Sequence, residues 1–157
     1  MKKLPIAILI SLFAAGMASA QTPTEIHKKQ YNLDESGLAI KGYDPVTYFT
    51  AHKAEEGRKD IALTTEGVTY HFATAQDRDL FKSNPEKYQP QYGGWCAYAT
   101  GATGEKVDID PETFELTDGK LFLFYNKFFN NTKKTWDKDA VNLKKKADIN
   151  WAKTIQQ

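Results

Sequence analysis

The residues with the clearest potential for chemistry are one cysteine and one histidine. Cys96 is the single cysteine of the chain and lies in an aromatic, glycine-containing segment, while His71 lies in a segment that alternates like a β-strand. A thiolate and an imidazole together can bind copper or zinc, or can form a nucleophilic pair. The structural alternative is that Cys96 packs under Trp95 as a small apolar residue and that His71 is hydrogen-bonded at a sheet surface.

Two residues do not complete a metal site, so further ligands are required. Asp44 and His52 are the candidates that we predict to complete a site with Cys96 and His71, and copper is the leading metal. On this hypothesis the protein binds a transition metal or a metal complex.

Aromatic residues suggest a second kind of site. Tyr43, Tyr92, Trp95 and Tyr98 could line a pocket, because each combines an apolar body with a polar group, although aromatic residues at this density also build cores. Such a pocket predicts a cofactor-free interaction module that binds a partner segment or a small apolar ligand. No Ser-His-Asp order, paired-carboxylate spacing or C-x-x-C motif is present, so the sequence does not indicate an enzyme.

Two hairpins and two helices are expected to position these residues. Glu66-Gly67 joins strands predicted at 61–65 and 68–73, and Asp118-Gly119 joins strands predicted at 113–117 and 120–126. Thr74 is expected to cap a helix, and apolar residues from Trp136 to Ile155 recur at helical spacing. The predicted fold is a small α+β domain, a mainly antiparallel sheet packed by helices that include a C-terminal helix.

The segments outside these elements support weaker expectations. Residues 38–41 resemble a short strand, residues 21–30 are expected to form a flexible lead-in or a short helix, and residues 101–106 a flexible loop. The sequence shows no internal repeat. A single domain is predicted over residues 31–157.

The N-terminal residues predict export. Lys2 and Lys3 precede an apolar stretch, and Ala18-Ser19-Ala20 is a typical cleavage site, so we expect a periplasmic or secreted protein that begins at Gln21, with no stable membrane anchor. Cleavage leaves 19 of the 21 basic residues against 20 acidic ones. This balance gives no overall attraction for nucleic acid.

Several of these segments together resemble the small periplasmic members of the YHS domain family. They are Gly42 to Val46, Tyr70-His71-Phe72, Asn84 to Tyr88, Gln91 to Ala97 and Val107 to Pro111. The resemblance covers roughly residues 31–155 and implies an α+β fold related to modules that bind copper or another transition metal through cysteines. The corresponding thiol positions hold Thr47 and Ala73 here, which leaves Cys96 as the thiol available to a metal.

Overall fold

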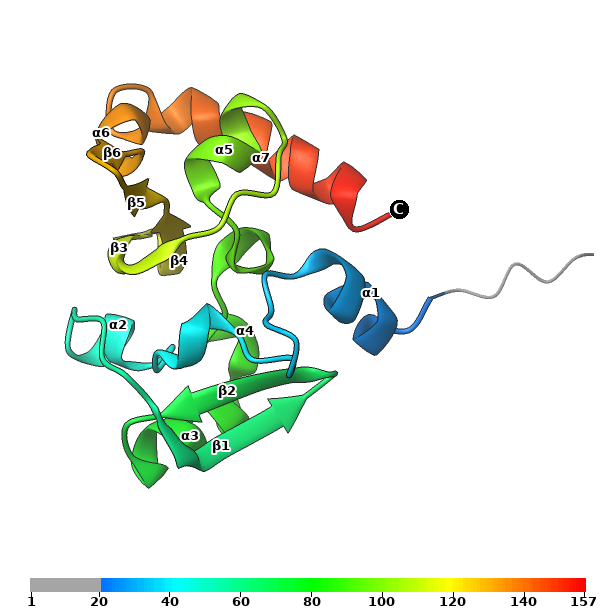
Figure 1. Cartoon of the computed structure of the whole chain (residues 1–157), viewed down its shortest axis with the longest axis vertical. Helices are drawn as coiled ribbons and strands as arrows, with labels where there is room; N and C mark the ends of the chain where they lie inside the picture. Colours follow the sequence, from blue (N-terminus) through cyan, green and yellow to red (C-terminus); the bar gives the residue numbers. More distant parts are fainter. Residues whose placement is uncertain (1–20) are drawn as a thin grey trace, which may run out of the picture.

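The computed structural model describes residues 21–157 and has the predicted α+β fold (Figure 1). The predicted signal sequence and cleavage site, residues 1–20, lie outside the described residues. The helices are α1 (Pro23–Gln30), α2 (Thr47–Thr50), α3 (Ala75–Ser83), α4 (Pro85–Tyr88), α5 (Ala97–Ala102), α6 (Lys133–Trp136) and α7 (Ala140–Thr154). The strands are β1 (Arg58–Thr65), β2 (Val68–Phe72), β3 (Asp110–Thr117), β4 (Lys120–Phe124), β5 (Asn126–Lys127) and β6 (Asn130–Asn131).

The two predicted hairpins form, but they remain separate two-stranded sheets instead of joining into one. β1 pairs with β2 and β3 pairs with β4, both antiparallel, and β5 and β6 form a third small hairpin that the sequence did not predict. The preceding segment forms parallel bridges with each large hairpin, Leu38 with Thr69 in the first, and Pro90 with Leu121 and Cys96 with Leu123 in the second.

The chain contains a structural repeat that sequence inspection missed. β1 and β2 begin at Arg58 and Val68, and β3 and β4 begin at Asp110 and Lys120, so each strand recurs 52 positions later with the same length. The register irregularity also recurs 52 positions later. Arg58 pairs with Phe72 before the first bulge, and Asp110 pairs with Phe124 before the second. The two hairpins are thus copies of one backbone unit.

The segments before the two hairpins repeat as well. The turns η1 (Ile40–Gly42) and η2 (Gln91–Gly94) each contain three consecutive left-handed residues. Their φ angles are 51°, 53° and 83° at Ile40, Lys41 and Gly42, and 56°, 59° and 84° at Tyr92, Gly93 and Gly94. Residues 38–41 therefore end in a left-handed turn and do not form the predicted strand. A helix follows each turn, α2 in the first case and α5 in the second. We call the segment from each turn to the helix after its hairpin a copy, so the first copy runs from Ile40 to Ser83 and the second from Gln91 to Trp136.

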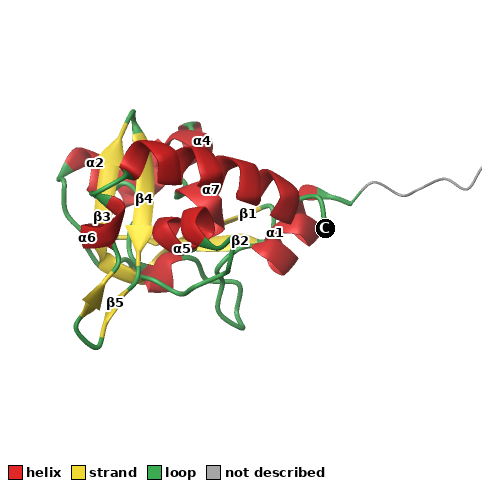
Figure 2. Ribbon diagram, turned by 90° about the horizontal axis from the view of Figure 1, so that it is seen from above, coloured by secondary structure: helices red, strands yellow, loops and turns green. Residues whose placement is uncertain are grey.

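Two apolar clusters form the core, and the larger one joins the two copies. The larger one contains Tyr70 and Phe72 from the first copy and Ile109 and Leu123 from the second. The smaller one is aromatic and lies beneath α7, which packs beside α5 (Figure 2). The two helices approach closely at Gly101, where a Cβ would come within 2.5 Å of the Leu143 carbonyl oxygen.

Two segments that were expected to be irregular are helical. Residues 23–30 form α1, whose N-terminus has a capping box between Thr22 and Glu25, so the short-helix alternative for residues 21–30 is the one observed. The first residues of the predicted 101–106 loop belong to α5, because burial against α7 outweighs the low helix propensity of Gly101. None of the helices in residues 21–157 is long and apolar enough to cross a membrane.

Candidate functional site

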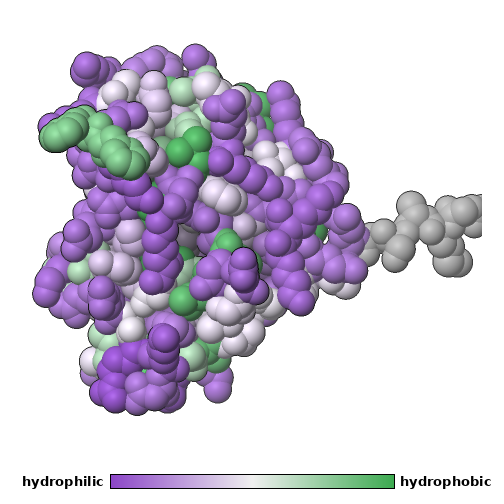
Figure 3. All heavy atoms as spheres, in the orientation of Figure 1, coloured by the Kyte–Doolittle hydropathy of each residue, from purple (hydrophilic) through white to green (hydrophobic). Residues whose placement is uncertain are grey.

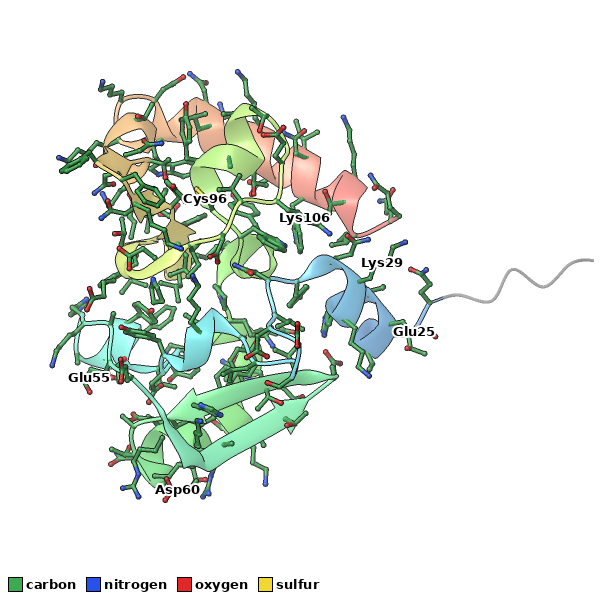
Figure 4. The ribbon with its side chains drawn as sticks, viewed as in Figure 1. Glu25, Lys29, Glu55, Asp60, Cys96 and Lys106 are labelled. Atoms are coloured by element: carbon green, nitrogen blue, oxygen red, sulfur yellow. The ribbon has the colours of Figure 1, made fainter. Side chains whose placement is uncertain are left out.

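Cys96 is a buried structural residue. Its side chain has no exposed surface, and Figure 4 shows it within the half of the molecule built by the second copy. The backbone N–H of Tyr125 donates a hydrogen bond to Sγ at 3.3 Å, and the Thr132 hydroxyl oxygen lies 3.3 Å from the same sulfur. The thiol sulfur thus accepts a hydrogen bond from the backbone that follows β4.

Asp44 occupies the equivalent place in the first copy. It lies 52 positions before Cys96, and its Oδ2 accepts the N–H of Ala73, the counterpart of Tyr125, at 2.7 Å. Its Oδ1 accepts the N–H of Val46 at 2.7 Å. Burial raises the pKa of Asp44 from 3.8 to about 6, because the loss of hydration outweighs the backbone hydrogen bonds that favour the charged form.

The two histidines lie apart from this arrangement. His71 is half-buried on β2, where a Cβ at Gly42 would come within 3.3 Å of its Nδ1, and His52 is exposed in a turn with φ of 51°. Among residues 21–157, no three or more His, Cys, Asp or Glu side chains lie close enough to one another to hold a metal ion. The structure therefore does not assemble Cys96, His71, Asp44 and His52 into a common site.

The four predicted pocket aromatics are also separated. Tyr43 packs against the larger cluster, and the Trp95 indole N–H donates to the Gln30 carbonyl oxygen of α1 at 2.6 Å. Tyr92 belongs to the smaller cluster, and Tyr98 packs against both clusters. The Tyr92 hydroxyl donates to Asp148 on α7 at 2.9 Å, and burial raises its pKa. These residues act mainly in packing.

The smaller cluster nevertheless has a pocket at its surface. A cavity of about 260 Å³ lies between the β3–β4 hairpin and the helices α6 and α7. Its lining residues are Glu115, Thr117, Asp118, Phe122, Trp136, Ala140, Val141, Lys144 and Lys145. Phe122 and Trp136, each 1% exposed, form the apolar floor, and the charged residues surround it. We call this cavity the Trp136 pocket.

Trp136 carries an unusual feature for a buried residue. Its indole Nε1 is buried and finds no hydrogen-bond partner within residues 21–157, and it is the one buried side-chain nitrogen or oxygen there with this property. Leaving such a donor unpaired costs about 1–3 kcal/mol. The indole N–H is thus a free donor in a residue that lines an apolar pocket.

A second cavity of about 260 Å³ lacks such a donor. It lies where the two copies meet, with Leu38, Ile40 and Ile109 in its lining. Its charged groups are already paired, because Lys41 Nζ lies 2.6 Å from Asp108, whose other oxygen accepts from Asn32 at 3.3 Å. The Trp136 pocket is therefore the better candidate for a ligand site.

Sequence reasoning placed Trp136 on a buried helical stripe and gave it no binding function. Nothing in the sequence distinguishes an indole whose N–H is paired from one whose N–H is free, since the partner would come from a distant segment. Comparisons with protein-family models, with curated proteins and with solved structures gave no match. Membership of the YHS family therefore stays a prediction.

Proposed function

We propose that the protein is a binding module that holds a small, mainly apolar ligand in the Trp136 pocket, without a catalytic centre or a resident metal. The observation that carries this proposal is the unpartnered indole N–H of Trp136 in the wall of an apolar cavity. Small-molecule sites combine an apolar lining with a few polar groups that fix orientation. This pocket has that composition.

The pocket limits the chemistry of its ligand. A volume of about 260 Å³ is near the lower end for ligand sites, so one ring system or a short chain would fill it. The ligand should carry one hydrogen-bond acceptor for the Trp136 N–H. Val141 and Lys145 also line the pocket, and both are exposed on the first half of α7.

Binding of 6-propionyl-2-(dimethylamino)naphthalene, a neutral fluorescent probe with one naphthalene ring system and a carbonyl oxygen as acceptor, tests the proposal in protein lacking residues 1–20. We expect saturable binding at one site per chain, seen as a rise in probe fluorescence. Ala140→Leu places extra volume inside the pocket and should abolish this binding. The matched control is Ala152→Leu, the same change at an exposed position of the same helix, which should bind like wild type.

Trp136→Phe tests the role of the donor itself. It keeps an aromatic floor but removes the N–H, so affinity should fall about five-fold, the value of one neutral hydrogen bond. Unchanged binding in Ala140→Leu would place the probe elsewhere and overturn the proposal. Unchanged binding in Trp136→Phe alone would show that the probe binds in the pocket without a hydrogen bond from the indole N–H.

Copper binding stays a prediction with its own measurement. Because Cys96 has no exposed surface, we expect no reaction with a thiol reagent in the folded protein and full reaction after denaturation. A thiol that reacts in the folded protein and becomes protected by one equivalent of copper would instead support a metal site at Cys96.

A further inference from the structure

The small β5–β6 hairpin is an insertion into the second copy of the repeat. In the first copy, only Ala73 and Thr74 separate β2 from the following helix. In the second copy, the chain leaves β4 and forms β5 and β6 before α6 begins at Lys133. The hairpin projects at one end of the molecule next to α6 (Figures 1 and 2). It contributes nothing to either apolar cluster.

Two phenylalanines form the tip of this insertion. Phe128 and Phe129 have relative exposures of 88% and 112%, so both rings lie fully in solvent. Both have left-handed backbones, with φ of 52° and 62°, a conformation that normally selects Asn and Gly in two-residue hairpin turns. Figure 3 shows an apolar projection in this region, surrounded by hydrophilic surface. The chain thus exposes two large apolar groups in a strained turn.

The base of the hairpin is held in place. Asn126 pairs with Asn131 in the short sheet, and its side-chain amide donates to the Thr113 hydroxyl at 2.9 Å. The Thr132 N–H donates to the Tyr125 carbonyl oxygen at 3.0 Å. These bonds tie the hairpin to the sheet, so the rings are presented away from the body and do not fold back on it.

The segment around the tip is strongly basic. Residues 120–146 contain eight lysines and two acidic residues, a net charge of +6. The other residues after position 20 contain 11 basic and 18 acidic residues, a net charge of −7. Lys127 adjoins the tip and Lys134 lies on α6, and both are exposed. The near-neutral net charge of the whole chain does not reveal this uneven distribution of charge.

We propose that the β5–β6 hairpin docks reversibly on an anionic phospholipid surface, with Phe128 and Phe129 inserted between headgroups and the neighbouring Lys127 and Lys134 facing the phosphates. The tip presents two apolar rings beside positively charged lysines. An anionic bilayer surface can deform around such a tip, and it offers an apolar interior for the rings and negative phosphates for the lysines. A protein partner would instead need a matching pocket surrounded by acidic groups. This docking is independent of the Trp136 pocket and is not a stable anchor.

Cosedimentation with vesicles tests the proposal, using protein without residues 1–20 so that their apolar stretch cannot contribute. We expect binding to phosphatidylcholine vesicles that contain phosphatidylglycerol, and much weaker binding to phosphatidylcholine alone. Phe128→Ala/Phe129→Ala should reduce binding on the order of tenfold or more, because two apolar rings are lost. Rising salt should weaken binding of the wild type.

The matched control is Ile149→Ala, which removes an exposed apolar side chain from α7, away from the hairpin, and should bind like wild type. Equal binding by the double variant would overturn the role of the hairpin. Equal binding to both kinds of vesicle would overturn the role of charge. Failure to sediment with either vesicle would overturn lipid docking, and capture of a defined acidic protein through the same two rings would replace it.

Discussion

At the scale of single residues, the repeat gives Cys96 and Asp44 the same task. Both are buried acceptors for the first N–H after a hairpin, that of Tyr125 in one copy and that of Ala73 in the other. A thiol performs this task without charge, whereas a carboxylate must lose hydration when it ionises. Backbone hydrogen bonding thus gives the Cys96 thiol a structural role.

The raised pKa of Asp44 predicts a pH dependence of stability. In the unfolded chain Asp44 ionises near 3.8, but in the folded protein it ionises only near 6, so the unfolded state binds fewer protons between these values. The contribution of Asp44 to the free energy of unfolding should therefore be fully present below about pH 4 and decrease by about 3 kcal/mol as the pH rises to above 6.

Urea denaturation of wild type and Asp44→Asn across this pH range measures the effect. The variant cannot ionise at this position, so the difference between the two curves should contain the decline assigned to Asp44. A difference that does not change between pH 4 and 7 would show that Asp44 ionises alike in both states.

At the scale of elements, the β5–β6 turn is the clearest conflict between local preference and structure. L-residues in the left-handed region cost roughly 1–2 kcal/mol each, and neither phenylalanine ring gains burial in exchange. A turn that is costly in the free protein is expected where a segment serves an external contact. This conflict is independent support for a functional hairpin.

Phe128→Asn/Phe129→Gly should stabilise the protein. These residues adopt left-handed conformations readily, so the free energy of unfolding should rise by about 1–3 kcal/mol in chemical denaturation. Phe128→Ala/Phe129→Ala is the matched control, because it removes the same rings but keeps two left-handed L-residues. If the two double variants are equally stable, the turn is not strained in the folded protein.

At the scale of the whole molecule, the two copies cannot be treated as separate domains. The larger apolar cluster takes Tyr70 and Phe72 from the first copy and Ile109 and Leu123 from the second. Neither copy could bury these side chains alone. The two copies therefore share one core, and the second carries the Trp136 pocket and the inserted hairpin.

Equilibrium unfolding should consequently be a single transition. All three tryptophans, Trp95, Trp136 and Trp151, follow the first copy in sequence, so their fluorescence reports on the second half of the chain, whereas far-UV circular dichroism reports on both halves. We expect the two signals to change with the same urea midpoint and slope. Two separated midpoints would show that the copies unfold independently.

The local elements could be predicted from neighbouring residues alone. An acidic residue before glycine predicted both hairpin turns, and Thr74 predicted the start of α3, where its side chain accepts the Asp77 N–H. The spacing of apolar residues predicted the C-terminal helix. These signals act between residues that are close in the chain. The β5–β6 hairpin was missed because its turn residues, Phe128 and Phe129, are the opposite of what such a turn prefers.

The repeat and the site depend on contacts that form in the folded chain. Between residues 40–74 and 92–126 the identical pairs are four, Gly42/Gly94, Thr65/Thr117, Gly67/Gly119 and Phe72/Phe124, too few to show a duplication. The two copies can share a backbone because different side chains make equivalent contacts. Asp44 and Cys96, for example, each accept the first N–H after a hairpin. Whether Cys96 is exposed and whether the Trp136 N–H has a partner depend on contacts between distant segments, and local spacing contains no information about them.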